Sequence, residues 1–192
     1  MAISLSKGQT ISLKKESTGL KKVHMGVGWD PVAPKGFFAK LKGPKVIDLD
    51  ASLITFDATK QPAEIIFYKQ LQSADGAILH TGDNRTGDGD GDDEVIKVDL
   101  ERLDPKVETL VFFVNSYQGQ TFDEVDNAFC RVLDDETQKE LCRFTLTDQG
   151  AHTGVVMAVM SRNGGDWQLK AVGMPGVGRT ADQLVPDALR HI

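Results

Sequence analysis

The sequence has no long hydrophobic run and no basic stripe, and each absence excludes a class of protein. No apolar run approaches the roughly 18 residues needed to span a bilayer; the longest, at 155–160, has six. The net charge is −6 and no stripe of Lys or Arg offsets it, which argues against a nucleic-acid-binding surface. The first residues show no charged head followed by an apolar stretch. We therefore expect no secretory signal and a cytoplasmic location.

The chain is also poor in cysteine, with only Cys130 and Cys142. Their spacing is not that of a CxxC zinc or redox motif. The two residues flank a turn-like sequence, D-D-E-T-Q, at 134–138. If Leu133 pairs with Lys139 across this turn, Cys130 faces Cys142 on the adjacent strand, which would allow a conditional disulfide. In a reducing compartment, however, two buried apolar thiols are the favoured interpretation.

Motifs for nucleophilic catalysis are missing as well. The sequence contains no G-x-S-x-G motif, the turn that presents a catalytic serine in many hydrolases. None of the four histidines has metal-ligand or triad spacing to another ligand type; they are His24, His80, His152 and His191. His80 precedes an acidic segment and could support ligands there, although a surface or turn histidine is the simpler interpretation. We therefore expect no enzyme activity.

What the sequence does contain is a two-residue alternation of apolar and polar side chains, which predicts half-buried β-strands. In one segment Val23, Met25 and Val27 fall on one face, and His24 and Gly26 on the other. The tight-turn sequence at 163–166 predicts a hairpin between the last two strands. The predicted strands are 11–14, 23–29, 47–53, 64–68, 95–100, 107–115, 129–133, 140–146, 154–162 and 167–173.

Helical patterns are scarce. Thr121 and Glu124 have the spacing of a capping box and predict a short helix over 121–127. Residues 180–190 predict a terminal helix that Pro186 would break or bend. We therefore expect a mainly β protein, a two-sheet β-sandwich with one or two short helices. We expect residues 1–192 to form a single domain in which the Pro-, Gly- and Lys-rich segment 31–44 is an exposed loop.

The most informative stretch is the acidic segment, D-N-R-T-G-D-G-D-G-D-D-E, at 83–94, with six acidic side chains and one base, Arg85. Carboxylates this close repel one another unless a cation lies among them. The glycines allow the backbone to curl, so that side-chain and carbonyl oxygens can point at a common centre. Oxygen donors suit hard divalent ions, and a flexible, crowded set suits calcium better than magnesium. The alternative is a solvated acidic loop.

Three carboxylates outside the acidic segment are expected to join it. Asp48 and Asp50 stand two apart on a predicted strand, so their side chains project from one face; the alternative for them is the solvent face of an edge strand. Asp30 ends another predicted strand, at a rim where sandwich loops gather. We therefore expect one or two calcium ions at this rim. The expected ligands are Asp30, Asp48, Asp50, Asp83, Asn84, Gly87, Asp88, Asp90, Gly91, Asp92, Asp93 and Glu94.

Two related motifs do not fit the acidic segment. An EF-hand loop starting at Asp88 would need glycine in place of Asp93 and glutamate in place of Asp99, and its flanks would have to be helices. A phosphate-binding glycine loop uses backbone N–H groups and commonly a lysine, whereas these side chains would repel an anion. A metal-dependent hydrolase acting on phosphoesters or nucleotides is the alternative function, because two-metal sites use clustered aspartates. No general acid or base and no positively charged clamp stands out for it.

Six motifs follow one another in the order found in a known family. The chain resembles the TerD family of bacterial tellurium-resistance and stress proteins, most closely its TerD/TerZ-type members. Segment 31–44 and the tail 174–192 depart from the commonest family pattern. The motifs are S-L-S-K-G-Q-T-I-S-L at 4–13, G-V-G-W-D at 26–30, D-L-D-A-S at 48–52, G-D-N-R-T-G-D-G-D-G-D-D-E at 82–94, N-A-F-C-R-V at 127–132 and W-Q-L-K-A-V-G at 167–173.

The resemblance implies a calcium-binding β-sandwich, in which the acidic segment and the partner aspartates hold the ion. It also implies a place in the cellular response to tellurite, with links to phage and colicin resistance. As partners it implies other Ter proteins, some of them membrane-bound, and it is compatible with peripheral membrane association. Nucleic acid is not expected as a partner.

Overall fold

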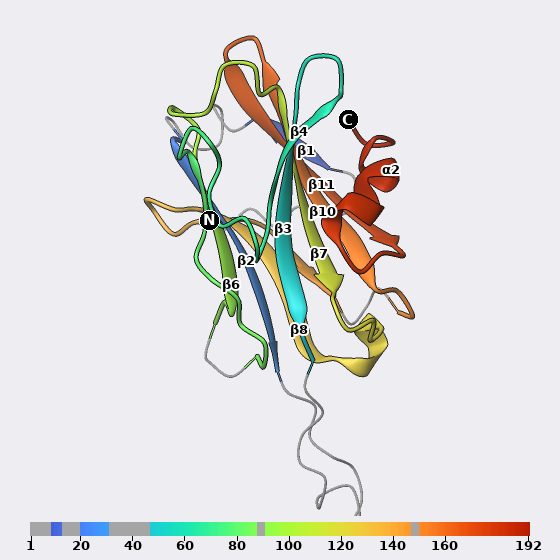
Figure 1. The fold of residues 1–192 in the computed structure, drawn as a ribbon. Coiled ribbons are helices and arrows are strands. Elements are labelled where there is room, and N and C mark those ends of the chain that lie inside the picture. The colour runs from blue at the N-terminus through green and yellow to red at the C-terminus, as the bar shows by residue number, and fades with distance from the viewer. Residues whose placement is uncertain (1–8, 13–19, 31–46, 88–90, 147–149) are drawn as a thin grey trace, which may run out of the picture.

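Two antiparallel sheets pack face to face in the computed structural model, which describes residues 9–12, 20–30, 47–87, 91–146 and 150–192 (Figure 1). Sheet A has the strand order β1-β11-β10-β7-β3-β4, and sheet B has the order β5-β6-β2-β8-β9. The strands are β1 (Thr10–Ser12), β2 (Lys22–Asp30), β3 (Leu49–Phe56), β4 (Pro62–Ile66), β5 (Ile78–His80), β6 (Glu94–Asp99), β7 (Thr109–Ser116), β8 (Asp126–Asp134), β9 (Glu140–Thr145), β10 (Gly154–Asn163) and β11 (Asp166–Gly176).

The mainly β, two-sheet architecture predicted from the sequence is confirmed. Each of the ten predicted strands corresponds to an observed strand, and β10 and β11 form the expected hairpin, with Asn163 opposite Asp166. The sequence did not predict β5, because three residues are too few to show an alternation.

The main core lies between the two sheets and follows from the alternation in the sequence. Val23, Met25 and Val27 of β2 point inward from sheet B, and alternate residues of β3, such as Leu49 and Leu53, point inward from sheet A. All five are fully buried. The opposite face of β2 is therefore free to carry polar side chains, and so is the opposite face of β3 at its start.

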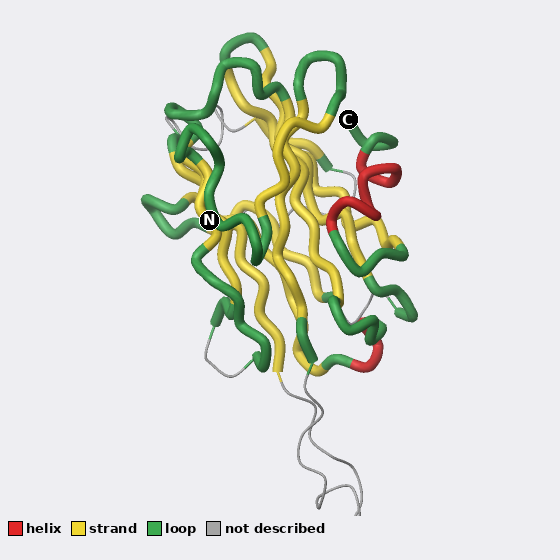
Figure 2. Tube along the Cα trace, in the orientation of Figure 1, coloured by secondary structure: helices red, strands yellow, loops and turns green. Residues whose placement is uncertain are grey.

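A second core covers the outer face of sheet A. Here Phe56 and Phe113 of the sheet pack against Leu184 and Ala188 of the C-terminal segment, which we define as residues 177–192. That segment holds the 3₁₀ helix η3 (Ala181–Leu184) and the helix α2 (Val185–Ala188), drawn red beside the strands in Figure 2. The C-terminal segment thus forms a third, partial layer.

Both predicted helices are shorter than expected. The helix predicted over 121–127 is too long. Only the 3₁₀ turn η1 (Phe122–Glu124) forms, because Val125 has an extended backbone and β8 begins directly after it. Glu124 nevertheless accepts the N–H of Thr121, as a capping box requires. The terminal helix is divided into η3 and α2. Pro186 lies in the first turn of α2, where its missing N–H breaks no helical hydrogen bond. In the described ranges, no helix has the length and hydropathy required to cross a membrane.

The predicted pairing of Cys130 with Cys142 is wrong, because Leu133 pairs with Glu140 instead of Lys139 and a register shift between Val132 and Leu133 adds to the offset. Cys130 lies opposite Phe144, and Cys142 lies opposite Val132. Both cysteines are free and fully buried, as the favoured interpretation expected. Burial raises the pKa of the Cys142 thiol to about 12 and that of Cys130 well above its ordinary value. Neither thiol is therefore a reactive thiolate at neutral pH.

The second core should contribute substantially to stability through Leu184. This side chain is fully buried and lies so close to Gly154 that a Cβ there would be 3.0 Å from Leu184 Cδ1. Leu184→Ala should lower the free energy of unfolding by about 2–5 kcal/mol in urea denaturation, because it leaves a cavity. Val177→Ala is the matched control: Val177 is 77% exposed, so its change should stay within about 0.5 kcal/mol. Equal effects of the two variants would contradict the packing described.

Candidate metal centre

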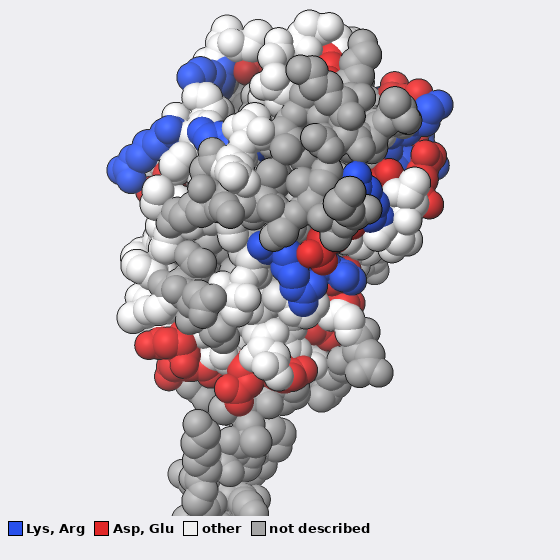
Figure 3. Space-filling view, turned by 180° about the vertical axis from the view of Figure 1, so that it is seen from behind, with Lys and Arg blue, Asp and Glu red and all other residues white. Residues whose placement is uncertain are grey.

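Several polar strand ends meet at one rim of the sandwich. The end of β2 and the start of β3 both lie at the lower end of Figure 1. The register places Glu94, which begins β6, opposite Val27, and Ser116, which ends β7, opposite Leu49. From the back, acidic side chains gather along this lower end, and lysines and arginines lie above them (Figure 3). The rim is therefore the acidic end of the molecule on that face.

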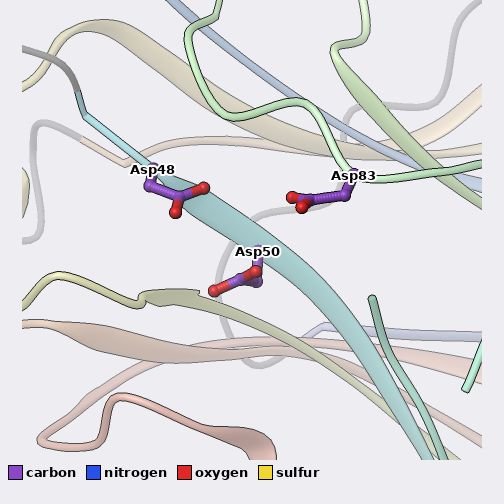
Figure 4. A group of neighbouring side chains, drawn as sticks. All are labelled: Asp48, Asp50 and Asp83. Carbon is purple, nitrogen blue, oxygen red and sulfur yellow. The ribbon is translucent and has the colours of Figure 1, made fainter. Parts of the chain in front are cut away.

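Three aspartates converge at the rim, and we call them the aspartate trio: Asp48, Asp50 and Asp83. One carboxylate oxygen from each lies within 4.8 Å of the other two, and Figure 4 shows the side chains of Asp48 and Asp83 turned toward each other above Asp50. Asp50 projects from the outer face of β3, Asp48 immediately precedes this strand, and Asp83 reaches them from the loop that follows β5. The structure thus brings together two aspartates at the start of β3 and one aspartate of the acidic segment.

Asp48 and Asp50 are buried, with only 5% and 3% exposure. The alternative interpretation, a solvent-facing edge strand, is therefore wrong. β3 lies inside sheet A, between β7 and β4. β4 pairs with β3 only from Leu53 onward, so the first half of β3 has a free edge that faces the acidic segment.

Glu94 closes that free edge. Its Oε2 accepts the N–H of Ala51 at 2.7 Å, and its Oε1 accepts the N–H of Asn84 at 3.2 Å. Oε2 also lies 3.4 Å from Nε2 of the buried His80. The Nδ1 atom of His80 accepts the N–H of Gly82, so the proton of a neutral His80 is on Nε2 and faces Glu94. Glu94 therefore joins the acidic segment to β3.

The surroundings of the aspartate trio disfavour negative charge. Burial raises the pKa of Asp50 to about 8, and the carboxylates of Glu94, Asp48 and Asp83 add to this rise. Burial likewise raises the pKa of Asp48 to about 6, with further contributions from Asp83 and Glu94. The Oδ1 atom of Asp48 is buried without a hydrogen-bond partner in the described part of the chain. Buried acceptors normally have a partner, so this oxygen and its neighbours are suited to a cation.

A pocket of about 240 Å³ opens beside the trio. Its remaining walls are Tyr68, Arg85, Tyr117 and Gln118. The rings of Tyr68 and Tyr117 meet edge to face with their centroids 5.5 Å apart. The oxygen donors are of the hard type that calcium prefers, and the pocket gives an ion or its remaining ligands access from solvent.

Asp92 lies away from the trio, on the outer face of sheet B. Its carboxylate is bound by His24 Nε2 at 2.8 Å and by Arg131 Nε at 2.8 Å. Burial alone would raise the pKa of Asp92, but these hydrogen bonds and charges hold it below its ordinary value. The carboxylate fills the space left by the missing side chain of Gly26, because a Cβ on Gly26 would lie 2.3 Å from Asp92 Cγ. Asp92 thus anchors the acidic segment to sheet B.

Asp93 and Asp30 also bind neighbouring groups. Asp93 accepts the N–H of Trp29 through Oδ2 and the side-chain amide of Asn84 through Oδ1, both at 2.9 Å. Burial raises the pKa of Asp93, as do the nearby carboxylates of Asp30 and others. Asp30 is exposed and accepts the amide of Asn127 at 2.6 Å. These two carboxylates are near each other but lie outside the trio.

Asn84, Gly87 and Gly91 shape the backbone of the segment. Asn84 Oδ1 accepts the N–H groups of Thr86 and Gly87, both at 3.1 Å. Gly87 has a φ of 68°, and a Cβ there would lie 2.4 Å from the indole nitrogen of Trp29, so only glycine fits. Gly91 also has a positive φ, 95°, but a Cβ there would meet no described atom within 4 Å. The expected ligands Asp88 and Asp90 lie outside the described residues.

Sequence reasoning missed Asn115, which lies beside the trio. Its Nδ2 donates to Asp50 Oδ2 at 2.9 Å, and the residue is 2% exposed. The signal in the sequence was weak: Asn115 ends an apolar run at 110–114, on the same face as Val111 and Phe113. A polar residue at such a position is buried only if a partner is present, and here the partner is Asp50.

Comparisons with known proteins agree with this fold. The family model described as TerD domain matches residues 1–185. The tellurium resistance protein TerZ of Serratia marcescens is 50% identical over 191 residues, covering 99% of this chain and 98% of that protein. The stress response protein SCP2 of Bacillus subtilis (strain 168) is 43% identical over 184 residues, covering 90% of this chain and 92% of that protein.

The fold is also known from a solved structure. A crystal structure of a homologue of the telluride resistance protein (TerD) from Streptomyces coelicolor A3(2) superposes with a TM-score of 0.74 at 24% identity. The match covers 87% of this chain and 96% of that one. This agreement shows a shared fold, and the sequence matches lead to one conclusion: the chain belongs to the TerD domain family.

Proposed function

We propose that this protein is a calcium-binding component of the tellurite and stress response, acting as a non-enzymatic, ion-dependent interaction module in the cytoplasm. The observation that carries the proposal is the aspartate trio, with two buried carboxylates, a third within 4.8 Å and an unpartnered oxygen on Asp48. The names of the relatives TerZ and SCP2 support the response to tellurium and to stress.

Asp48, Asp50 and Asp83 would hold the ion. Calcium accepts six to eight oxygen ligands in flexible geometry, so three aspartates leave room for water, for backbone carbonyls or for a ligand from a partner. The bound ion would supply positive charge among carboxylates that otherwise repel one another. Glu94 and Asn115 orient the site from either side, since Glu94 binds the edge of β3 and Asn115 binds Asp50.

Ion binding would change what the rim presents to a partner. Without calcium, the rim carries the negative charge of neighbouring carboxylates beside the exposed ring of Tyr117. With calcium, this charge falls and the acidic segment is held between β3 and sheet B. A surface whose charge and order change together is suited to ion-dependent docking. Other Ter proteins, including membrane-bound ones, are the partners we propose, with peripheral association at a membrane surface.

Calcium should bind to the trio and stabilise the fold. Isothermal titration calorimetry should show calcium binding in preference to magnesium, and calcium at 100 times its Kd should add about 2.7 kcal/mol to the free energy of unfolding. Asp83→Asn should weaken binding by about tenfold or more, because it removes a charged ligand. Asp104→Asn is the matched control, since Asp104 is exposed in a turn outside the acidic segment.

The same titration separates this proposal from a metal-dependent hydrolase. Calcium binding that Asp83→Asn and Asp104→Asn alter equally would contradict the assignment of the trio. Turnover of phosphoesters with magnesium or manganese, lost in Asp83→Asn, would contradict a non-enzymatic role.

The stability of the calcium-free protein should fall as the pH rises. The carboxyl of Asp50 has a raised pKa of about 8 in the folded state, against about 4 in an unfolded chain. Between these values the folded state holds more protons than the unfolded state, so the free energy of unfolding decreases with pH. Thermal melts of calcium-stripped protein should therefore show a lower Tm at pH 8 than at pH 5.5.

Saturating calcium should reduce or reverse this fall in Tm, because the ion favours the ionised carboxylates that alkaline pH produces. Asp50→Asn provides the control: without the titrating carboxyl, the dependence of Tm on pH should flatten in the stripped protein. A pH dependence that is the same with and without calcium, and in Asp50→Asn, would be inconsistent with the trio as the ion site.

A further inference from the structure

Asn115 connects the aspartate trio with the C-terminal segment. Its Nδ2 donates one hydrogen bond to Asp50 Oδ2 at 2.9 Å and another to the carbonyl oxygen of Arg179 at 2.7 Å. Arg179 begins the part of the C-terminal segment that leads into η3. One buried amide group thus joins a proposed calcium ligand to the layer that covers the outer face of sheet A.

The orientation of this amide is determined by its neighbours. Both atoms facing Nδ2 are acceptors, the carboxylate oxygen of Asp50 and the carbonyl of Arg179, so the nitrogen and not the oxygen must face them. Both hydrogens of Nδ2 are used, one for each acceptor. A rotation of the Asn115 side chain that releases one acceptor therefore releases the other. The two contacts are expected to form and break together.

Arg179 is held from other directions as well. Its N–H donates to Gln183 Oε1 at 2.8 Å, which ties it to η3. Its Nη2 donates to the carbonyl of Gln118, in the loop after β7, at 3.3 Å. The same nitrogen lies against Gly119, where an added Cβ would be only 2.5 Å away. Gln118 also lines the pocket beside the trio. The start of the C-terminal segment and the wall of the ion site are therefore in direct contact.

We infer that Asn115 is a positioning residue that couples ion binding at Asp50 to docking of the C-terminal segment on sheet A. This inference rests on the calcium site proposed above and concerns its regulation. An ion at the trio would restrict the rotation of the Asp50 carboxylate and so hold its hydrogen bond with Asn115 in place. The same amide then retains the Arg179 carbonyl. Coupling of this kind is reciprocal, so a docked C-terminal segment strengthens calcium binding by the same factor.

Hydrogen–deuterium exchange on the full chain, with and without calcium, tests the coupling. In the wild-type protein, saturating calcium should slow exchange of the amides at 180–192 by about fivefold or more. In Asn115→Leu, calcium should still bind through the trio, about tenfold more weakly, and the protection of 180–192 should be lost. If the leucine variant does not fold, Asn115→Ser replaces it in the same measurement, because one hydroxyl can donate to only one of the two acceptors.

Val111→Ala is the matched control. Val111 is fully buried on the same strand and packs in the second core, but it lies opposite Ile54, away from Asp50. This variant should lose stability and yet keep the calcium-dependent protection of 180–192. A purely structural role for Asn115 would instead make the two variants behave alike.

The reverse direction can be measured by calorimetry. Leu184→Ala removes a buried side chain of the C-terminal segment and so loosens its docking. In the wild-type background this substitution should weaken calcium binding by the same factor by which calcium slows amide exchange in the segment. In the Asn115→Leu background the same substitution should leave calcium affinity unchanged, as a double-mutant cycle requires when the connection is already broken.

Failure of this inference is distinguishable from failure of the calcium site. If wild-type protein binds calcium but the exchange of 180–192 does not change, or slows equally in Asn115→Leu, the coupling is refuted and the calcium site stands. If calorimetry detects no calcium binding to the wild-type protein, the proposed function and the coupling both fall.

Discussion

Repulsion among the carboxylates of the aspartate trio is the constraint on which the rim of this sandwich depends. Asp48 and Asp50 are buried next to each other and within 4.8 Å of Asp83, where desolvation and like charge both oppose ionisation. Among the described residues the surroundings supply few donors: the nearby N–H of Ala51 is taken by Glu94, and Asn115 is the one side chain there that donates to Asp50. The site is thus rich in hard acceptors, and Arg85, which lines the pocket and lowers the pKa of Asp48, does not outweigh the factors that raise it. A divalent cation would correct this imbalance.

Most of the fold could be predicted from the sequence because alternation reports directly which face of a strand is buried. Val23, Met25 and Val27 show this in β2, where all three point into the main core. Features that depend on local backbone irregularity could not be predicted. The pairing of Leu133 with Glu140 and the shift between Val132 and Leu133 together move Cys142 away from Cys130. Nothing in the residue pattern of 129–133 indicates such an irregularity.

The candidate site could be predicted in composition but not in arrangement. Two-residue spacing correctly placed Asp48 and Asp50 on one face. The expectation that loops gather at a sandwich rim correctly placed Asp83 near them. Asp92 lies outside the trio because it binds His24 and Arg131, which come from β2 and β8 and are far from it in sequence. Long-range partners of this kind are set by the packing of the sheets, and charge patterning along the chain does not report them.

The most direct test of the account is to locate the ion. Anomalous diffraction from crystals grown with calcium should show one peak at about 2.3–2.6 Å from carboxylate oxygens of Asp48, Asp50 and Asp83. A second ion elsewhere on the acidic rim would not disturb this assignment. The absence of a peak at the trio in crystals that hold calcium elsewhere would contradict it.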